Sequence, residues 1–473
     1  MRNNIILMGA VIMLLLTGCV EKPSKTTTTQ EIKTTTTDTP TASIKTTTTS
    51  TSTTMTECSI PEIKGEGRYG IPFFGIEEDF IQTNDLTSLT TEDIRELGVK
   101  IARTHGGPFV WDIVEPTKGT YNFTLTDEVV SQAADSEVTL LASLWPYALW
   151  DQGSIESCKV GGKIDAMRDR IPDYRCIPQD MQSHNIFLKE LVERYVGDDD
   201  YGTQPITEEM KAKIRENPVR YWEINNEVDV GNNIDTAKFF QGTVEEYVDL
   251  MENSYNSIKE VCSDCQVIIA APAADTKGFY TQVFNLGGRT YFDIYNLHCP
   301  IEVLKEFINP IDKPVIMTEA GGRAGAKLAI EAVTLAFDGV DSAMLTMTVD
   351  RAKVKSKNLE EDPKKKSTES FKEGFLLDGD GGRTSAYTAM KILTHELSGF
   401  KRVQSINTGK EVTGYSFLFN HKGPVRVYYV DKEGNEQETI TVEGEATIKD
   451  INGNIVKKTG SITIEKDNFY FVS

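Results

Sequence analysis

Short runs rich in Val, Ile and aromatic residues alternate with amphipathic stretches along the chain from about Arg68 onward. This alternation predicts parallel β-strands joined by crossover helices. The runs expected to be strands are Tyr69 to Ile76, Val99 to Thr104, Val138 to Leu144, Val219 to Asn225, Gln266 to Ala271, Phe292 to Leu297, Pro314 to Thr318 and Ser342 to Thr348. The stretches expected to be helices include Thr91 to Leu97, Ile186 to Tyr195, Val244 to Val261, Ala326 to Ala336 and Ser385 to Leu397.

Eight such units close most naturally into a barrel, and a span from Ile60 to Phe400 fits the range of about 200 to over 400 residues that barrels of this kind occupy. An open doubly wound sheet is the alternative. Its nucleotide-binding form is disfavoured because no Gly-x-Gly-x-x-Gly turn follows the first strand. The predicted fold class is therefore α/β, a (β/α)₈ TIM barrel over residues 58–400.

The pattern changes after Phe400 to alternating strands and turns. The expected strands there are Val425 to Val430, Thr439 to Val442, Ala446 to Ile448 and Phe469 to Val472. The Asn452-Gly453 pair between the last two is a typical turn sequence. Residues 401–473 are therefore predicted to form a small C-terminal all-β domain.

The N-terminus has the features of an export signal. An apolar run from Ile5 to Leu16 is shorter than the ~20 residues that cross a bilayer, so residues 1–18 are predicted to be a signal peptide. The next residues, Leu16-Thr17-Gly18-Cys19, resemble the lipobox of prokaryotic lipoproteins, which implies a lipidated Cys19 and a location on the extracellular face of the cell membrane. Ordinary cleavage near Gly18, with Cys19 left as a thiol, is the alternative. The Thr-dominated sequence that follows predicts a disordered stalk over residues 19–57.

Charge and cysteine content narrow the function classes. The chain has 71 acidic and 50 basic residues, a formal net charge of −21, and its cations are scattered, so nucleic acid is not an expected partner. An even number of cysteines besides Cys19 indicates disulfides in an exported protein, and Cys158 with Cys176 and Cys262 with Cys265 are the expected local pairs. A zinc site at Cys262 and Cys265 is the alternative, but no second Cys or His pair at ligand spacing accompanies it. No metal and no cofactor are expected.

Acidic residues end two of the predicted strands. Glu227 closes the fourth strand, where period two places Glu223, Asn225 and Glu227 on the barrel interior, and Glu319 closes the seventh in the same way. Reactive groups of such barrels lie at the carboxyl ends of the strands. Two carboxyl groups about 5 Å apart are what glycoside cleavage with retention requires. Structural carboxylates, or a barrel that binds sugar without cutting it, are the alternatives.

The chain resembles clan A of the glycoside hydrolases at these two positions. Asn226-Glu227 and Thr318-Glu319 match the clan's acid/base and nucleophile motifs, and Arg103-Thr104-His105-Gly106 and the strand ending in His298 are similar to its family 39 and family 42 branches. The resemblance implies a retaining glycosidase with Glu227 as acid/base and Glu319 as nucleophile. It covers about Tyr69 to Phe400.

Further residues are expected to bind substrate or to hold the two acids. Asn226 would bond a sugar hydroxyl, Arg103 would hold Glu319 ionised or pair with Glu223, and His105 and His298 lie at strand ends. The aromatic rings of Trp145 and Trp150 follow the third strand and suit sugar faces, with core packing as the alternative for Trp145.

The clan's usual tyrosine, two residues after the strand-six histidine, is replaced by Pro300, so Tyr295 or another loop residue would take its place beside Glu319. The function expected overall is cleavage of O-glycosidic, β-linked bonds in oligo- or polysaccharides. A surface lipoprotein that binds carbohydrate without hydrolysis is the runner-up, and a scaffold whose β domain contacts another protein is the third reading.

Overall fold

The computed structural model describes residues 68–80, 88–105, 107–160, 171–229, 239–308, 310–320, 323–349, 374–378, 381–408, 411–430, 437–442, 445–458 and 460–473. The expected signal peptide, Cys19 and the Thr-rich stalk lie outside these residues. Within the described ranges, no helix is both long enough and apolar enough to cross a membrane.

A parallel barrel forms the larger part of the described chain. Its strands are β1 (Phe74–Glu77), β2 (Ile101–Thr104), β3 (Thr139–Leu144), β4 (Tyr221–Ile224), β5 (Gln266–Ile269), β6 (Tyr295–Leu297), β7 (Val315–Met317) and β8 (Ser342–Val349). They pair in the order β5-β4-β3-β2-β1-β8-β7-β6, and β9 (Phe375–Leu377) pairs with β8. A parallel bridge between Ile268 and Ile294 joins the two ends of this path. The predicted eight-stranded barrel is confirmed.

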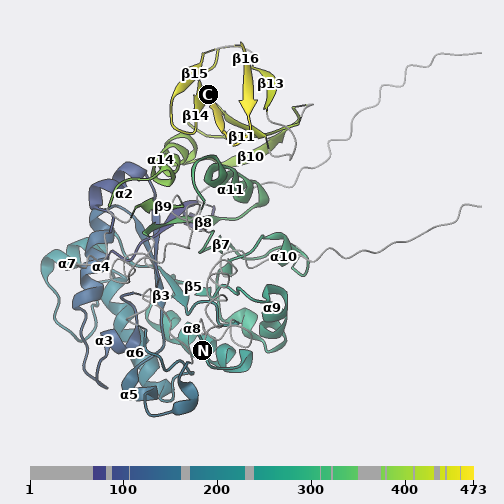
Figure 1. The fold of residues 1–473 in the computed structure, drawn as a ribbon. Coiled ribbons are helices and arrows are strands. Elements are labelled where there is room, and N and C mark those ends of the chain that lie inside the picture. The colour runs from purple at the N-terminus through teal and green to yellow at the C-terminus, as the bar shows by residue number, and fades with distance from the viewer. Residues whose placement is uncertain are drawn as a thin grey trace, which may run out of the picture. The chain divides into compact units, whose positions relative to one another are not determined.

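Helices lie outside the strands (Figure 1). Those after β1 to β4 are α2 (Thr91–Leu97), α3 (Trp111–Val114), α4 (Thr124–Asp135), α5 (Leu149–Gln152), α6 (Met181–Tyr195), α7 (Glu208–Glu216) and α8 (Val244–Val261). Those after β5 to β9 are α9 (Thr276–Asn285), α10 (Glu302–Lys305), α11 (Gly325–Asp338) and α14 (Ser385–Leu397). Capping boxes at Thr90 and Thr243 start α2 and α8 at the residues where the sequence pattern predicted them.

The amino-terminal half of the barrel interior is filled by apolar side chains. The cluster consists of Ile71, Ile101, Leu141, Tyr221, Ile268, Ile294, Ile316 and Met344. Gly75 is required beside this layer, because a Cβ there would lie 2.4 Å from Met344 Sδ and 2.9 Å from Ile101 Cγ2. The buried charged residues Glu77, Arg103 and Glu223 lie beyond this layer, toward the carboxyl ends of their strands.

Antiparallel strands make up the C-terminal region. A six-stranded sheet has the order β10-β11-β12-β17-β14-β15, and β13 and β16 form a separate pair. The bounds are β10 (Arg402–Ile406), β11 (Val412–Leu418), β12 (Val425–Val430), β13 (Gln437–Val442), β14 (Ile448–Asp450), β15 (Ile455–Lys457), β16 (Gly460–Glu465) and β17 (Tyr470–Val472). Gly453 turns the β14–β15 hairpin at φ +81°, as the Asn452-Gly453 pair predicted. The prediction of a C-terminal β domain is confirmed.

Two disulfides join local cysteine pairs, Cys158 with Cys176 and Cys262 with Cys265. Both expected pairings are confirmed, and the zinc alternative at Cys262 and Cys265 is thereby removed. Cys299 is buried next to His298, and its Sγ lies 3.1 Å from Thr276 Oγ1.

Candidate active site

Charged and polar side chains gather where five barrel strands end. Glu77 is the last residue of β1, and Arg103 lies in β2 with His105 just beyond it. Glu223 lies in β4 and Glu227 follows its end. The remaining members come from β6 and β7 and are Asn296, His298, Thr318 and Glu319. Because parallel strands all present their carboxyl ends to one side of a barrel, residues far apart in sequence become neighbours, such as Arg103 and Glu319, which are 216 positions apart.

The fully buried guanidinium of Arg103 is the centre of this group. Its five N–H groups meet five oxygen acceptors: Nε and Nη2 donate to the two oxygens of Glu223 at 2.8 and 3.0 Å, and Nη2 also donates to Asn226 Oδ1 at 2.7 Å. Nη1 donates to Glu77 Oε1 at 2.6 Å and to Glu319 Oε1 at 2.9 Å. Arg103 therefore makes both contacts that the sequence suggested for it, and none of its N–H groups is left over for a substrate.

Glu223 lies within β4, closer to the barrel interior than the two candidate catalytic acids at the strand ends, and is completely buried. Besides Arg103, it accepts hydrogen bonds from Asn296 Nδ2 at 2.6 Å, from Thr318 Oγ1 at 3.4 Å and from Ser143 Oγ. These donors satisfy its oxygens without solvent, so Glu223 fixes Arg103 in place rather than meeting a ligand.

Glu319 lies among three cationic or basic groups. Its Oε1 is 2.9 Å from Arg103 Nη1, 3.1 Å from His105 Nδ1 and 3.7 Å from His298 Nε2. Burial by itself raises the pKa of this carboxyl, but His298, His105 and Arg103 outweigh burial and hold the pKa of Glu319 well below its usual value. The side chain is thus ionised and oriented by fixed donors.

Glu227 faces Glu319 across a short gap. Glu227 Oε1 lies 3.0 Å from His298 Nδ1, and the other ring nitrogen of His298 lies 3.0 Å from Thr318 Oγ1. A carboxylate oxygen of Glu227 and one of Glu319 are within 4.8 Å of each other. Burial lowers the pKa of His298, but Glu319 and Glu227 raise it overall. The structure brings Glu227, Glu319, His298, His105 and Arg103 together, as the sequence predicted.

The backbone leaves the strand conformation before Glu227. Strand β4 ends at Ile224, and Asn225 and Glu227 have φ values of +69° and +43°. The period-two alternation expected from Glu223 to Glu227 is therefore wrong beyond Ile224. Asn225 donates to Tyr147 OH at 2.6 Å, whereas Asn226 is the residue that reaches Arg103. Among the described residues, the buried Nδ2 of Asn226 has no hydrogen-bond partner, so an amide donor remains for a ligand.

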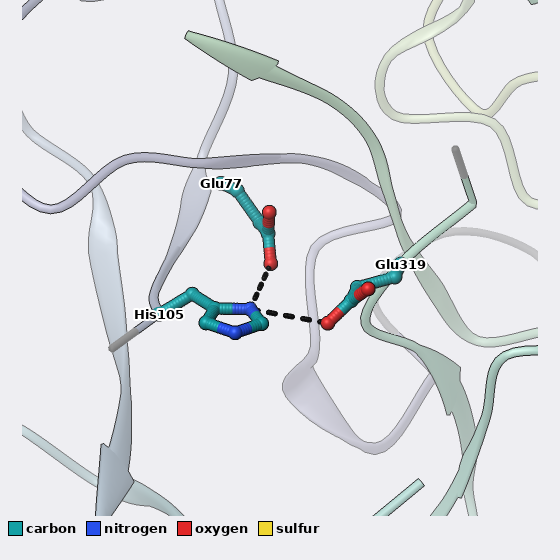
Figure 2. A group of neighbouring side chains, drawn as sticks. All are labelled: Glu77, His105 and Glu319. Atoms are coloured by element: carbon teal, nitrogen blue, oxygen red, sulfur yellow. Dashed lines mark hydrogen bonds and ion pairs between the residues drawn. The ribbon is translucent and has the colours of Figure 1, made fainter. Parts of the chain in front are cut away.

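Glu77 and His105 form a pair beside Glu319 (Figure 2). His105 Nδ1 lies 2.9 Å from Glu77 Oε1 and 3.1 Å from Glu319 Oε1. Burial lowers the pKa of His105, but the charges of Glu77 and Glu319 raise it to about 9. At neutral pH the imidazole is therefore a cation between two carboxylates.

Two groups of side chains have the composition of a metal site, Glu77 with His105 and Glu319, and Glu227 with His298 and Glu319. In the first group Arg103 Nη1 lies 2.6 to 3.1 Å from all three candidate ligand atoms and takes the place of a cation. In the second group both ring nitrogens of His298 are within hydrogen-bond distance of protein oxygens. Hydrogen bonding within the protein therefore accounts for both groups.

The two tryptophans proposed as sugar platforms have other surroundings. Trp145 is fully buried, with its ring centroid 5.7 Å from Phe239 and 6.0 Å from His105, which is the core packing given as its alternative. Trp150 packs edge-on against Trp111 at 4.9 Å and donates to the carbonyl of Glu115 at 2.8 Å.

Sequence reasoning missed Glu77 and Asn296. The signal for Glu77 was available, because an acidic residue ends the first strand just as Glu319 follows the seventh. Tyr295 does not replace the absent tyrosine beside Glu319, because its hydroxyl donates to Asp312 at 3.0 Å.

A search with family models found no match to this chain, and a search of curated proteins found none either. Comparison with solved structures gives clear likenesses. A family 39 glycoside hydrolase from Bacteroides cellulosilyticus superposes with a TM-score of 0.56 at 14% identity, covering 84% of this chain and 80% of that one. The chain shares the fold of this glycoside hydrolase.

Two further structures extend the likeness. A family 39 β-xylosidase from Caulobacter crescentus gives a TM-score of 0.53 at 13% identity, with 87% of this chain and 97% of that chain covered. The catalytic domain of a family 30 xylanase from Talaromyces cellulolyticus gives 0.54 at 12% identity, with the same coverage. The resemblance to the family 39 branch is thus confirmed at the level of the fold.

Proposed function

We propose that this chain is a retaining glycoside hydrolase that cleaves β-linked O-glycosidic bonds of oligo- or polysaccharides. The observation that carries the proposal is the separation of at most 4.8 Å between oxygens of Glu227 and Glu319 at the ends of β4 and β7. Retaining enzymes hold their two carboxyl groups about 5 to 5.5 Å apart, whereas inverting enzymes leave about 6.5 to 9.5 Å for a water molecule. The shared fold with glycoside hydrolases supports the same assignment.

In the first step Glu319 attacks the anomeric carbon and Glu227 gives its proton to the departing oxygen. Arg103 and His105 keep Glu319 ionised and direct its Oε1, and His298 lies on the other side, in contact with Glu227. The bond from the anomeric carbon to the leaving oxygen breaks as the bond to Glu319 forms, which gives a glycosyl-enzyme.

In the second step Glu227 takes a proton from water, and the water oxygen displaces Glu319 from the anomeric carbon. Two inversions leave the configuration unchanged. The Asn226 Nδ2 group, which has no hydrogen-bond acceptor among the described residues, is placed to donate to a substrate hydroxyl beside the anomeric carbon. Its carbonyl oxygen is already held by Arg103, which orients the amide.

The substrates to test first contain pentoses, because structural neighbours are named as β-xylosidases and as an α-L-arabinofuranosidase. Aryl β-xylosides, aryl α-L-arabinofuranosides and xylan fragments form the panel, with mannan, galactan and glucan fragments added. Nuclear magnetic resonance of the first product anomer tests retention directly, and an inverted first product would refute the mechanism.

The roles of the two acids are tested by alanine variants on an aryl glycoside with a good leaving group. Glu319→Ala should abolish turnover and be partly rescued by azide with an inverted product. Glu227→Ala should still form the glycosyl-enzyme and be rescued by azide with a retained product. Glu128→Ala, which removes a carboxylate from the exposed side of α4, is the control and should keep wild-type rates. Tight oligosaccharide binding without turnover in the wild type would select the binding lipoprotein instead.

We also propose that the enzyme works at the outer face of the cell membrane. The basis is the Leu16-Thr17-Gly18-Cys19 stretch followed by the Thr-rich segment. A lipid on Cys19 would hold the barrel near the cell that uses the released sugar.

A further inference from the structure

The nucleophile's oxygen has an unusual set of neighbours. Where clan A relatives place a tyrosine, this chain has Pro300, and the hydroxyl of Tyr295 is engaged with Asp312. In the described part of the chain, the groups within 3.1 Å of Glu319 Oε1 are Arg103 Nη1 and His105 Nδ1. The imidazole of His105 therefore occupies the role of second donor.

Glu77 determines how His105 can serve as that donor. The backbone N–H of His105 donates to Asp79 Oδ1 at 2.6 Å, which fixes the residue, and Glu77 Oε1 lies 2.9 Å from the same ring nitrogen that faces Glu319 (Figure 2). Two carboxylates on one nitrogen require a hydrogen there, and their two negative charges favour the cationic form of the ring over the neutral Nδ1–H tautomer. Arg103 Nη1 is also 3.1 Å from this nitrogen, but the five N–H groups of Arg103 already meet five oxygens, so Nδ1 need not accept.

We propose that Glu77, acting through His105, is a positioning residue of the nucleophile: it holds the imidazole in its cationic form, with the one Nδ1–H lying between Glu77 Oε1 and Glu319 Oε1. The inference rests on the proposed function, because it assigns a role in the attack by Glu319. Glu77 itself touches neither the reacting carbon nor the leaving group.

Several charged groups among the described residues surround His105 and enter this balance. Glu77 on β1 and Glu319 after β7 favour the imidazolium, while Arg103 on β2 opposes it. Asp79 faces the backbone N–H of His105. Groups one contact further away are Glu223 across Arg103, His298 beside Glu319 and Glu227 beside His298.

The proposal predicts a specific consequence of removing the charge of Glu77. In Glu77→Gln the imidazole loses one of its two anionic neighbours, so the pKa of His105, about 9 in the wild type, should fall by about one pH unit or more. Above the new value the cation beside Glu319 is lost. The alkaline limb of kcat/KM should then move to lower pH by the same amount.

Two measurements on the full chain test this. Nuclear magnetic resonance titration follows the His105 ring, identified by its absence in His105→Gln, in the wild type and in Glu77→Gln. Kinetics use a dinitrophenyl glycoside of the sugar found to be cleaved, whose departure needs little proton transfer, so that the alkaline limb does not report Glu227. Glu78→Gln is the matched control. Glu78 is also buried, but its carboxylate accepts from the backbone N–H groups of Phe80 and Leu89 rather than contacting His105. The pKa of His105 and the alkaline limb of kcat/KM should both match the wild type in this variant.

The outcomes separate the two proposals. An unchanged His105 titration in Glu77→Gln overturns the inference, and so does a shifted titration without a shift of the alkaline limb. A Glu77→Asp variant should restore most of both readouts, because it keeps the charge. A wild-type protein without turnover on the whole panel refutes the proposed function instead. The titration alone then decides whether Glu77 keeps the imidazole of His105 cationic.

Discussion

Replacing Arg103 with Met tests whether the site depends on one buried cation. Arg103 is fully buried and bonds to Glu77, Glu223 and Glu319, and the substitution would leave these three carboxylates without their shared donor. Removing one partner of a buried ion pair costs about 3 to 5 kcal/mol. We expect at least that loss of unfolding free energy, a large part of the roughly 5 to 15 kcal/mol that holds a typical domain folded.

A double variant makes the estimate sharper. Glu223 is completely buried and accepts two of the five Arg103 hydrogen bonds. In Arg103→Met it therefore becomes a buried carboxylate without its cationic partner, and Glu223→Gln removes that unpaired charge. The Arg103→Met, Glu223→Gln protein should therefore recover about 0.5 to 3 kcal/mol relative to Arg103→Met alone. The glutamine oxygen can still accept from Asn296 Nδ2.

The assay is urea unfolding followed by circular dichroism at constant pH. Arg289→Met is the matched control, because Arg289 pairs with Asp312 at 2.8 Å with both side chains more than 40% exposed. Such a pair contributes about 0 to 1 kcal/mol. If Arg103→Met loses no more unfolding free energy than this control, or if the double variant recovers none, Arg103 is not the shared cation on which the three carboxylates depend.

Three further predictions concern stability and processing. His184 is buried between Trp111 and Phe187, and burial lowers its pKa to about 3, so it contributes stability above pH 6.5 that is lost as the pH falls toward 3. His184→Phe should therefore narrow the difference between the urea midpoints at pH 7.5 and pH 4. An unchanged difference would contradict this. Replacing Cys158 and Cys176 by Ser should lower the unfolding free energy by about 3 kcal/mol, since the disulfide joins cysteines 18 positions apart in sequence. Equal thermal midpoints of the variant and the wild type would argue against this. Mass spectrometry of natively expressed protein should find a diacylglyceryl group on Cys19, and an unmodified thiol there would remove the anchor.

The parts of the fold predicted from sequence are those with local causes. The strand before Glu319 is a continuous apolar run, and the strand before Glu227 is apolar except for Glu223. The helix of Val244–Val261 begins at a capping box that can be read from its residues. The positions of the two acids follow, because parallel strands bring their carboxyl ends together.

What the sequence did not predict depends on contacts across the barrel or on backbone conformation. The position of Glu77 at a strand end could have marked it as a candidate, but its pairing with Arg103 depends on closure of the barrel. The left-handed conformation of Asn225 ends the alternation that seemed to continue to Glu227, since no glycine marks the change. The contact between Trp150 in α5 and Trp111 in α3 depends on how these two short helices pack, which residue type alone does not specify.

The left-handed residues after β4 have a thermodynamic consequence for ligand binding. Asn225 and Glu227 hold φ values that side chains with a Cβ adopt at a cost, and the hydrogen bond from Asn225 to Tyr147 maintains them without any ligand. The end of β4 has therefore already lost its conformational entropy during folding. A rigid inhibitor shaped like the flattened sugar ring should therefore bind with little loss of affinity to ordering of this segment.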